Sequence, residues 1–371
     1  MTGACGRTLH VLALNSGSSS LKFGLYRVDS NGAEKLFGES VSTADDPDAM
    51  ARVVGVLAAS GMPPPNVIGH RIVHGGPALR QHCRIDDAVL QQLHAAAAFA
   101  PLHTPAALAL IRFAQKQFPG VPQVACFDTQ FHVDLPEVAR VLPIARELLS
   151  DGMQRYGFHG LSLESIVRQL GEALPQRLVV AHLGNGASIT ALKAGLSIDT
   201  SMGMTPSGGV IMGTRSGDLD PGVLVYLVRE KQFDAARLGA LMDHGSGLLG
   251  ISGLSGDMRL LHAAAASNRD ARLAIEMFCY SVRKQVAAMS AVLGGLDMLV
   301  FTGGIGENDA QVRAEICAGL AWMGVKLDAS GNGSMGPSGG LVSDSASRCP
   351  VLVLASKEDE EIARHAWELL A

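Results

Sequence analysis

Two segments far apart in the chain share one pattern, and this recurrence limits the possible fold more than any other feature. Residues 9–28 form an apolar run, the polar tip Asn15–Ser20 and a second apolar run. Residues 178–192 repeat this design around the tip Gly184-Asn185-Gly186. Short apolar runs joined by a polar tip that contains glycine are typical of β-hairpins. The sequence therefore predicts two hairpins, each opening one half of the chain.

Further elements follow each hairpin in the pattern of an α/β protein. Thr104-Pro105 supplies the N-cap and first-turn proline of a helix, and Gly294-Gly295 ends a long amphipathic helix. We expect strands at Ile68–Val73, Val124–Phe127, Met298–Thr302 and Val351–Ala355, helices at Ala106–Phe118, Arg269–Leu293, Ala310–Met323 and Glu360–Leu370, and loops at Ser201–Gly222 and Ser330–Gly340, the latter flexible and on the surface.

The length of 371 residues corresponds to two domains at about 150 residues each. We predict a first domain of residues 1–127 completed by the C-terminal helix 359–371, and a second domain of residues 128–358 that carries most of a nucleotide site. Each domain is a sheet covered by helices, and a ligand cleft lies between the two.

Composition excludes several classes of function. The net charge is −5 and no run of Lys or Arg occurs, which argues against nucleic acid as a partner. Six widely spaced cysteines without a Cys-x-x-Cys pair are typical of a reducing cytosol. No segment reaches the roughly 18 apolar residues of a membrane span. We therefore expect a cytoplasmic protein with no membrane partner.

The sequence contains neither a P-loop nor the glycine-rich loop of protein kinases. If the protein binds phosphate groups, we expect the hairpin tips to bind them. Residues 15–22 offer an amide, several hydroxyls, backbone N–H groups freed by Gly17, and the cation of Lys22. Such groups suit phosphate oxygens, and Asn15 suits a metal ion. A plain hydrophilic turn is the alternative for one tip, but two similar tips make it less plausible. Phe301–Asn308 is expected to be a strand end, a glycine turn and a helix start, which suits a nucleotide across the backbone or is only a tight structural turn.

Eight blocks of the sequence resemble the acetate kinase family, in the family's order and across nearly the whole chain. These blocks are Asn15–Lys22, Gly69–Gly76, Ala100–His103, Phe127–His132, Tyr156–Gly160, His182–Gly186, Met212–Arg215 and Gly303–Asn308. The resemblance implies two ribonuclease-H-like domains of the actin and Hsp70 superfamily that close over ATP. It also implies reversible, magnesium-dependent (or manganese-dependent) phosphoryl transfer from ATP to acetate, by a homodimer.

The resemblance assigns roles residue by residue. Arg71 would bind the substrate carboxylate, and Val73, Leu102, Phe158 and Pro206 would form an apolar pocket for its methyl group. His159 and Arg215 would stabilise the phosphoryl group in transfer, and Asp128 would be the active-site acid. Asn15 and Glu358 would hold the metal ion, and Lys22 would meet phosphate. ATP would lie on His182, Leu183, Gly184, Asn185, Gly186, Asp257, Met258, Arg259, Gly304, Ile305, Gly306, Glu307 and Asn308.

The chemistry of phosphoryl transfer agrees with these roles. Charge builds on the equatorial oxygens of the transferred group, so donors such as Arg215 and His159 belong beside the reaction line. A cation at Arg71 in an apolar strand needs a carboxylate, from a ligand or from an internal salt bridge. Acetate is already ionised at neutral pH, so Asp128 has no proton to remove and is expected to orient Arg71 or to act through metal-bound water.

Two segments depart from the family pattern. Ser207-Gly208-Gly209 replaces a common Leu-Glu-Gly, and Lys357 and Asp359 flank Glu358 where relatives often show Asn-Glu-Glu. A propionate or butyrate kinase on the same scaffold is the nearest alternative, although Val73 favours a small acyl group. A non-metabolic ATPase like actin or Hsp70 is the alternative from another class. The apolar pocket argues against a sugar kinase.

Overall fold

The computed structural model describes residues 7–17, 20–42, 49–101, 103–336 and 338–371. These residues divide into two compact units. The first consists of residues 1–133, 158–168 and 357–371, and the second of residues 134–157 and 169–356. The C-terminal helix thus belongs to the first unit, and so does segment 158–168, which the sequence analysis assigned to the second domain.

The first unit is built on a six-stranded sheet of order β3-β2-β1-β4-β6-β5. The first three strands are antiparallel, β1, β4 and β6 are parallel, and β5 returns antiparallel to β6. The strands are β1 (Leu9–Ser16), β2 (Ser20–Asp29), β3 (Gly32–Ser42), β4 (Val67–Ile72), β5 (Cys83–Arg84) and β6 (Gln123–Phe127).

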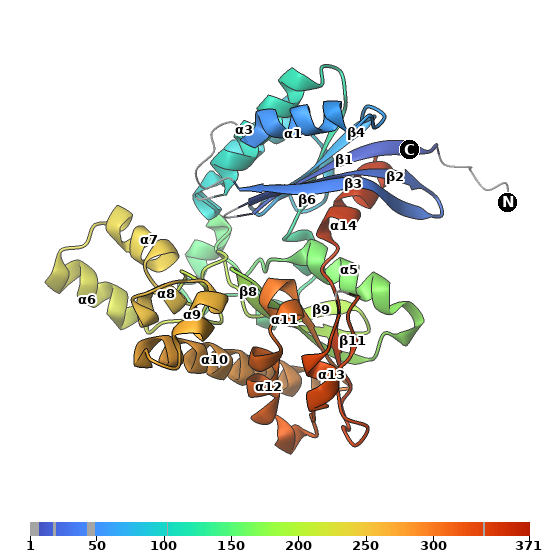
Figure 1. The fold of residues 1–371 in the computed structure, drawn as a ribbon. Coiled ribbons are helices and arrows are strands. Elements are labelled where there is room, and N and C mark those ends of the chain that lie inside the picture. The colour runs from blue at the N-terminus through green and yellow to red at the C-terminus, as the bar shows by residue number, and fades with distance from the viewer. Residues whose placement is uncertain (1–6, 18–19, 43–48, 102, 337) are drawn as a thin grey trace. The chain divides into compact units, whose positions relative to one another are not determined.

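Helices cover both faces of this sheet, so its central strands are buried on both sides. Leu12 and Leu14 of β1 pack in one cluster with residues of α1 (Ala49–Ala59) and α3 (Thr104–Gln117). Val11 and Ala13, which alternate with them, pack against α14 (Glu358–Glu368) on the other face. This alternation explains the continuous apolar run of β1. Figure 1 shows α14 in red beside the blue strands.

The second unit repeats this topology. Its sheet has the order β9-β8-β7-β10-β12-β11, with β9, β8 and β7 antiparallel, β7, β10 and β12 parallel, and β11 antiparallel. The helix α10 (Arg269–Leu293) contacts β7, β8 and β9. The strands are β7 (Arg177–Leu183), β8 (Ala187–Lys193), β9 (Leu196–Thr200), β10 (Met298–Thr302), β11 (Gly340–Leu341) and β12 (Val351–Val353). The predicted α/β fold of two similar units is confirmed.

The remaining elements are short helices and 3₁₀ turns. The helices are α2 (Asp87–Ala95), α4 (Glu137–Arg140), α5 (Gly160–Leu170), α6 (Pro221–Lys231), α7 (Ala235–His244), α8 (Gly247–Ser252), α9 (Met258–Ala264), α11 (Gly303–Asn308), α12 (Ala310–Ala318) and α13 (Ala329–Gly333). The 3₁₀ turns are Ala96–Phe99, Gln130–His132, Arg146–Asp151, Gly171–Ala173 and Ala321–Met323.

The glycine turn and helix start predicted at Gly303–Asn308 form one short helix, which already begins at Gly303. Two local predictions were wrong. The helix predicted to reach Met323 ends at Ala318. Segment 330–340 is not simply a flexible surface loop, because it continues α13 and its Asn332 is buried. The side chain of Asn332 accepts a hydrogen bond from Nε of the buried Arg313 at 2.8 Å, which fixes this glycine-rich segment.

Two further predictions concern composition. Within the described ranges, no helix is long and apolar enough to cross a membrane. The five cysteines placed there, Cys83, Cys126, Cys279, Cys317 and Cys349, form no disulfide.

Candidate active site

Three polar side chains of the first unit lie where parallel strands end. Asn15 is near the end of β1, Arg71 near the end of β4, and Asp128 directly after β6. Because the carboxyl ends of parallel strands meet at one edge of a sheet, these residues lie close together. Nη1 of Arg71 donates to Oδ1 of Asn15 at 3.1 Å. The cluster predicted from three separate sequence blocks therefore exists.

Arg71 and Asp128 form a buried two-pronged ion pair. Nε of Arg71 donates to both carboxylate oxygens of Asp128 at 3.0 Å, and Nη2 donates to Oδ2 at 2.6 Å. The side chain of Asp128 is 1% exposed and that of Arg71 is 12% exposed. Of the two partners left open in the sequence analysis, the structure shows the internal salt bridge.

The first turn of α14 adds two carboxylates to this cluster. Nδ2 of Asn15 donates to Oε2 of Glu358 at 2.9 Å and to Oδ1 of Asp359 at 2.8 Å. Oε2 of Glu358 also lies 3.7 Å from Nη1 of Arg71. Lys22 is exposed on β2, opposite Asn15 in the strand pairing. Asp359, which the sequence analysis treated only as a departure from the family, is thus part of the site.

The charges of this cluster do not balance. Arg71 faces the carboxylates of Asp128, Glu358 and Asp359. Burial raises the pKa of Asp128 to about 6, Arg71 opposes this shift, and the negative charge of Glu358 adds to it. Burial also raises the pKa of Asp359, and Glu358 reinforces this shift, whereas the hydrogen bond from Asn15 and the charges of Lys22 and Lys35 oppose it. An excess of buried negative charge suits a cationic ligand.

The neighbouring segment positions Phe158 and His159. The backbone N–H of Gly160 donates to the carbonyl of Asp128 at 2.8 Å, so the start of α5 is tied to the end of β6. His159, directly before α5, is buried and has the left-handed φ of 60°. Phe158 is buried with its ring against His74, and Val73 is half-buried after β4. Ser18, Ser19 and Leu102 lie outside the described residues.

In the second unit, the hairpin tip contacts two other loops. The N–H of Gly213 donates to the carbonyl of Asn185 at 3.2 Å. A Cβ atom on Gly213 would lie 2.3 Å from Oδ1 of Asn185 and 3.2 Å from the carbonyl of Gly256, so an alanine there would displace the Asn185 side chain. Asn185 is exposed, while His182 and Leu183 are buried at the end of β7. Three backbone segments therefore meet at this tip.

The helix α11 lies beside the same tip. A Cβ atom on Gly303 would lie 2.7 Å from the carbonyl of Leu183, whereas one on Gly304 would meet open space. Glu307 has a structural role, because its Oε1 accepts hydrogen bonds from the N–H groups of Gly303 and Ser356 at 2.9 Å. The amide of Asn308 bonds to the carbonyl of Gly304 within the helix. Ile305 is half-buried and Gly306 is buried.

Residues 257–259 form the start of α9. Oδ1 of Asp257 caps this helix by accepting the N–H of Arg259 at 2.9 Å, and Nη2 of Arg259 lies 2.6 Å from Oδ2 of Asp257. This hydrogen-bonded pair lowers the pKa of Asp257. Met258 is buried, whereas Arg259 is exposed. Asp257 thus has a structural function, and Arg259 is open to a ligand.

Arg215 is buried, although it lies in a glycine-rich loop. The residue is only 7% exposed, and its Nη1 donates to the carbonyl of Pro206 at 3.2 Å. The loop around it is fixed by α8, since a Cβ atom on Gly247 would lie 2.2 Å from the carbonyl of Met212. The substitution of Arg215 therefore affects packing as well as charge.

The two units hold different parts of the predicted site. The first brings together Asn15, Arg71, Asp128 and Glu358, with His159 beside them, and the second brings together the hairpin tip and α11. Sequence reasoning missed Asp359, Gly213 and Gly256. For Asp359 the sign was its position beside Glu358 at a helix start, where acidic residues are favoured. For the two glycines nothing in the sequence indicated which loops would touch.

The chain is similar to known proteins over nearly its whole length. The profile of the acetokinase family matches residues 39–364. An acetate kinase of Methylocella silvestris is 41% identical over 400 aligned positions, covering 97% of this chain and 98% of that protein. The crystal structure of a propionate kinase from Francisella tularensis matches with a TM-score of 0.86 and 34% identity, covering 98% and 100% of the two chains. That of the Porphyromonas gingivalis acetate kinase matches with a TM-score of 0.83 and 35% identity, with the same coverage.

Proposed function

The chain belongs to the acetokinase family, and we propose that it transfers the γ-phosphoryl group of ATP reversibly to acetate, giving ADP and acetyl phosphate. The observation that carries this function is the coincidence of the family match with a buried arginine at the strand ends of the first unit. The two units are assigned different tasks: acyl and metal binding in the first, nucleotide binding in the second.

Arg71 is proposed to bind the acetate carboxylate. Guanidinium is a planar fork with five N–H donors, and the protein takes up three of them with Asp128 and Asn15. The remaining donors suit a second carboxylate. Val73 and Phe158 supply apolar surface for the methyl group, with Leu102 and Pro206 assigned there from the family resemblance alone. Asp128 holds the guanidinium in place and is given no proton-transfer role.

Glu358 and Asp359 fit a magnesium ion, and the Asn15 amide, whose oxygen accepts from Arg71, would have to turn over to join them as a ligand. Carboxylates and amide oxygens are the hard ligands that Mg²⁺ prefers, and the excess negative charge around Arg71 is what a divalent cation offsets. When bound, the ion neutralises phosphate charge and helps to position the terminal phosphoryl group. Lys22, which lies near Asp359, adds a further positive charge for phosphate. Manganese has the same ligand preference.

ATP is proposed to lie on the loops of the second unit. Gly184 and Gly186 of the tip and Gly303 and Gly304 of α11 have no side chains, and a Cβ atom on Gly304 would meet open space. Such a surface admits phosphates and ribose close to the main chain. Asp257, Met258 and Arg259 complete this assignment. Arg215 and His159 are proposed to stabilise the charge on the phosphoryl group as it moves.

A homodimer is the proposed assembly. The helices α6 and α7 have no buried residue. Exposed apolar side chains of α6 are Val223, Leu224, Val225, Tyr226 and Val228. Apolar patches of this kind are typical of interfaces. Val225→Glu together with Tyr226→Asp should convert the dimer to a monomer in sedimentation velocity, and an unchanged sedimentation coefficient would contradict this interface. The five cysteines in the described part of the chain are free, as is usual in the reducing cytosol, which supports the proposed cytoplasmic location.

Acyl specificity tests the proposed function. Initial rates of ADP formation are measured with acetate, propionate, butyrate and glucose at fixed ATP and Mg²⁺. We expect the highest kcat/KM with acetate, lower values with longer acids, and no stimulation by glucose. Propionate is a serious alternative substrate because one structural relative is named a propionate kinase. A higher kcat/KM for propionate would replace acetate as the substrate, and stimulation by glucose alone would refute the assignment.

A further inference from the structure

A cluster of titratable side chains lies apart from the residues assigned above. His82 in the loop before β5, Glu164 on α5 and His365 on α14 place one possible ligand atom each within 4.8 Å of one another. All three residues belong to the first unit. Nε2 of His82 is buried and has no hydrogen-bond partner within the described part of the chain. Such a group of histidines and a carboxylate invites interpretation as a metal site.

The hydrogen bonds of His82 argue against a metal ion. The backbone N–H of Phe127 donates to Nδ1 of His82 at 3.0 Å, so the lone pair of Nδ1 is used. The neutral ring then carries its proton on Nε2, the atom that faces the cluster. Burial and the charge of His365 lower the pKa of His82 to about 3, so the ring is neutral at physiological pH. A protonated Nε2 has no lone pair to give to a metal ion.

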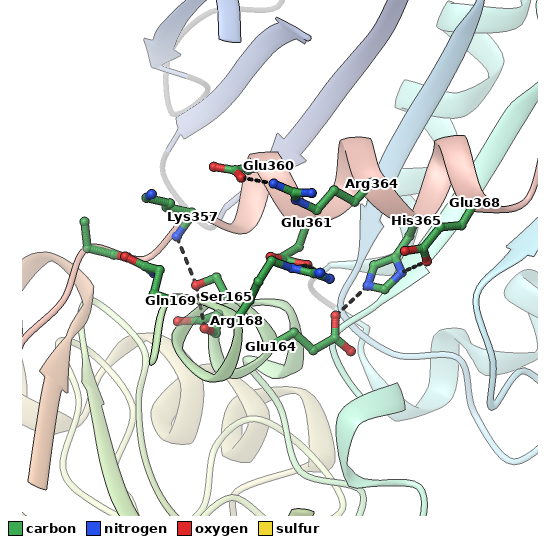
Figure 2. A network of polar contacts seen from close by, with 12 residues as sticks. Glu164, Ser165, Arg168, Gln169, Lys357, Glu360, Glu361, Arg364, His365 and Glu368 are labelled. Atoms are coloured by element: carbon green, nitrogen blue, oxygen red, sulfur yellow. Dashed lines mark hydrogen bonds and ion pairs between the residues drawn. The ribbon is translucent and has the colours of Figure 1, made fainter. Parts of the chain in front are cut away.

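His365 has the opposite protonation behaviour. Its Nε2 lies 2.6 Å from Oε2 of Glu164, and its Nδ1 lies 3.2 Å from Oε2 of Glu368. Although burial alone lowers it, the hydrogen bonds with these carboxylates raise the pKa of His365 to about 9. An imidazolium donates through both nitrogens at once. His365 is therefore a charged bridge between α5 and α14, as Figure 2 shows.

Two other contacts join the same helices. Nε and Nη2 of Arg168 on α5 donate to the buried carboxylate of Glu361 on α14 at 2.8–3.1 Å. The N–H of Lys357 donates to the hydroxyl of Ser165 at 3.2 Å. In Figure 2 these residues line the facing sides of α5 and α14, and His365 lies beyond them along α14. The helix is therefore held at its start, its middle and its end.

Both helices of this network lie next to or carry residues of the proposed site. Glu358 and Asp359 form the first turn of α14, and His159 precedes α5. The ring of His82 lies against that of His365, with centroids 4.1 Å apart, and its Nδ1 holds the backbone directly before Asp128. A shift of α14 along α5 would therefore move two carboxylates relative to Arg71.

We propose that His365 is a positioning residue, which fixes α14 against α5 through Glu164 so that Glu358 and Asp359 face Asn15 and Arg71. This inference rests on the proposed function, because the effect on catalysis passes through the metal ligands assigned there. Loss of one proton from His365 at high pH leaves a neutral ring that can donate to only one of its two carboxylate partners, which weakens the bridge and with it metal binding.

The titratable and charged groups around His365 leave His365 as the one expected to change its charge near pH 9. The facing helix α5 contributes Glu164, and α14 itself contributes Glu368. The loop before β5 contributes the neutral His82, and Cys126 of β6, near Glu164 and Glu368, has a buried thiol with a raised pKa. Further charged side chains of the two helices, Arg168, Glu361, Glu360 and Arg364, are paired with one another. His365 is thus the group of this set expected to change charge near pH 9.

Three variants and one control test the proposal. His365→Gln removes the charge, Glu164→Gln removes its partner, and His365→Lys keeps a charge that titrates at higher pH, near 10.4. His94→Gln is the matched control, since His94 is an exposed histidine on α2. The measurements are kcat and the KM for Mg²⁺ from pH 6.5 to 10, and amide hydrogen exchange of residues 357–361 at pH 7.

We expect His365→Gln and Glu164→Gln to raise the KM for Mg²⁺ about fivefold or more, a coupling of about 1 kcal/mol, with kcat within twofold of the parent. The rise in this KM near pH 9 should vanish in His365→Gln and move upward in His365→Lys. Exchange at residues 357–361 should be faster in both glutamine variants and unchanged in His94→Gln. If either glutamine variant folds and keeps the parent KM, pH profile and exchange, the proposal is overturned.

The exchange measurement separates this proposal from the proposed function. It reports on the first turn of α14 without substrate or metal ion. If Glu358→Gln leaves the KM for Mg²⁺ unchanged while exchange responds to His365→Gln, the metal assignment fails and the positioning role stands. If exchange does not respond, the positioning role fails whatever the role of Glu358.

Discussion

Asp128→Asn is the substitution that examines the acyl site most closely. The change keeps the shape of the side chain but removes its charge and one of its two acceptor oxygens. In the parent, Arg71 makes three hydrogen bonds of 2.6–3.0 Å to this carboxylate. Charge-assisted hydrogen bonds contribute about 1.5–3 kcal/mol each, so the guanidinium loses at least that much restraint. Glu358, 3.7 Å from Nη1, then becomes the competing partner of Arg71.

We expect Asp128→Asn to weaken the binding of acetate or Mg²⁺, because Asp128 orients Arg71 and does not accept a proton from the substrate. A restraint of 1.5–3 kcal/mol corresponds to about a 10- to 100-fold rise in the KM for acetate or for Mg²⁺, with lower activity. Because burial raises the pKa of Asp128 to about 6, parent kcat/KM should fall as the pH drops below 6, and the variant should lack this limb. Added guanidinium should partly restore Arg71→Ala but not the double variant with Asp128→Asn.

The control for this experiment is Asp297→Asn. Asp297 forms a similar two-pronged pair with Arg177, but on the surface of the second unit. Exposed pairs contribute about 0.2–1 kcal/mol, so this variant should lose little stability and no activity. One pattern refutes the orienting role of Asp128: Asp128→Asn loses activity and the acid limb, while the KM values for acetate and for Mg²⁺ stay at those of the parent. That pattern indicates proton transfer.

Four further outcomes are expected. Arg215→Ala should lower kcat by about 10² or more, and Arg215→Lys by less; parent turnover in a folded alanine variant removes this residue from the mechanism. Val73→Ala opens space for about two methyl groups, and each methyl group buried there contributes roughly 0.8 kcal/mol of apolar contact. The ratio of kcat/KM for propionate to that for acetate should therefore rise, and an unchanged ratio places Val73 outside the pocket. Gly213→Ala places a Cβ 2.3 Å from Oδ1 of Asn185, so the KM for ATP should increase while that for acetate does not. Because the pKa of His365 is raised in the folded state, this residue should contribute about 3 kcal/mol to the free energy of unfolding below pH 6.5, and this contribution should be lost as the pH rises through 9. The measurement is the difference in urea midpoint between parent and His365→Gln, and a difference that is the same at pH 6.5 and 9.5 contradicts the prediction.

The sequence allowed the framework of both sheets to be predicted because its signals were local. Apolar runs, glycine tips and the capped 25-residue helix Arg269–Leu293 each depend on neighbours in the chain. The cluster of Asn15, Arg71 and Asp128 followed from family blocks, and its physical basis is that their three strands are parallel and adjacent.

Long-range contacts explain what the sequence did not show. Arg313 and Asn332 order a segment that reads as low-complexity loop, and no local pattern relates the two. Segment 158–168 joins the first unit because Gly160 packs on the carbonyl of Asp128. The network of His82, Glu164 and His365 draws on three distant segments, and each of its members alone is an ordinary polar residue in the sequence.

The fate of the γ-phosphoryl group tests the central claim most directly. The protein is incubated with ATP, Mg²⁺ and acetate, and the products are followed by phosphorus-31 NMR. The proposed reaction predicts acetyl phosphate and ADP in equal amounts, no orthophosphate at early times, and no ADP without acetate. ADP formed together with orthophosphate, with or without acetate and without acetyl phosphate, would show an ATPase and contradict the account.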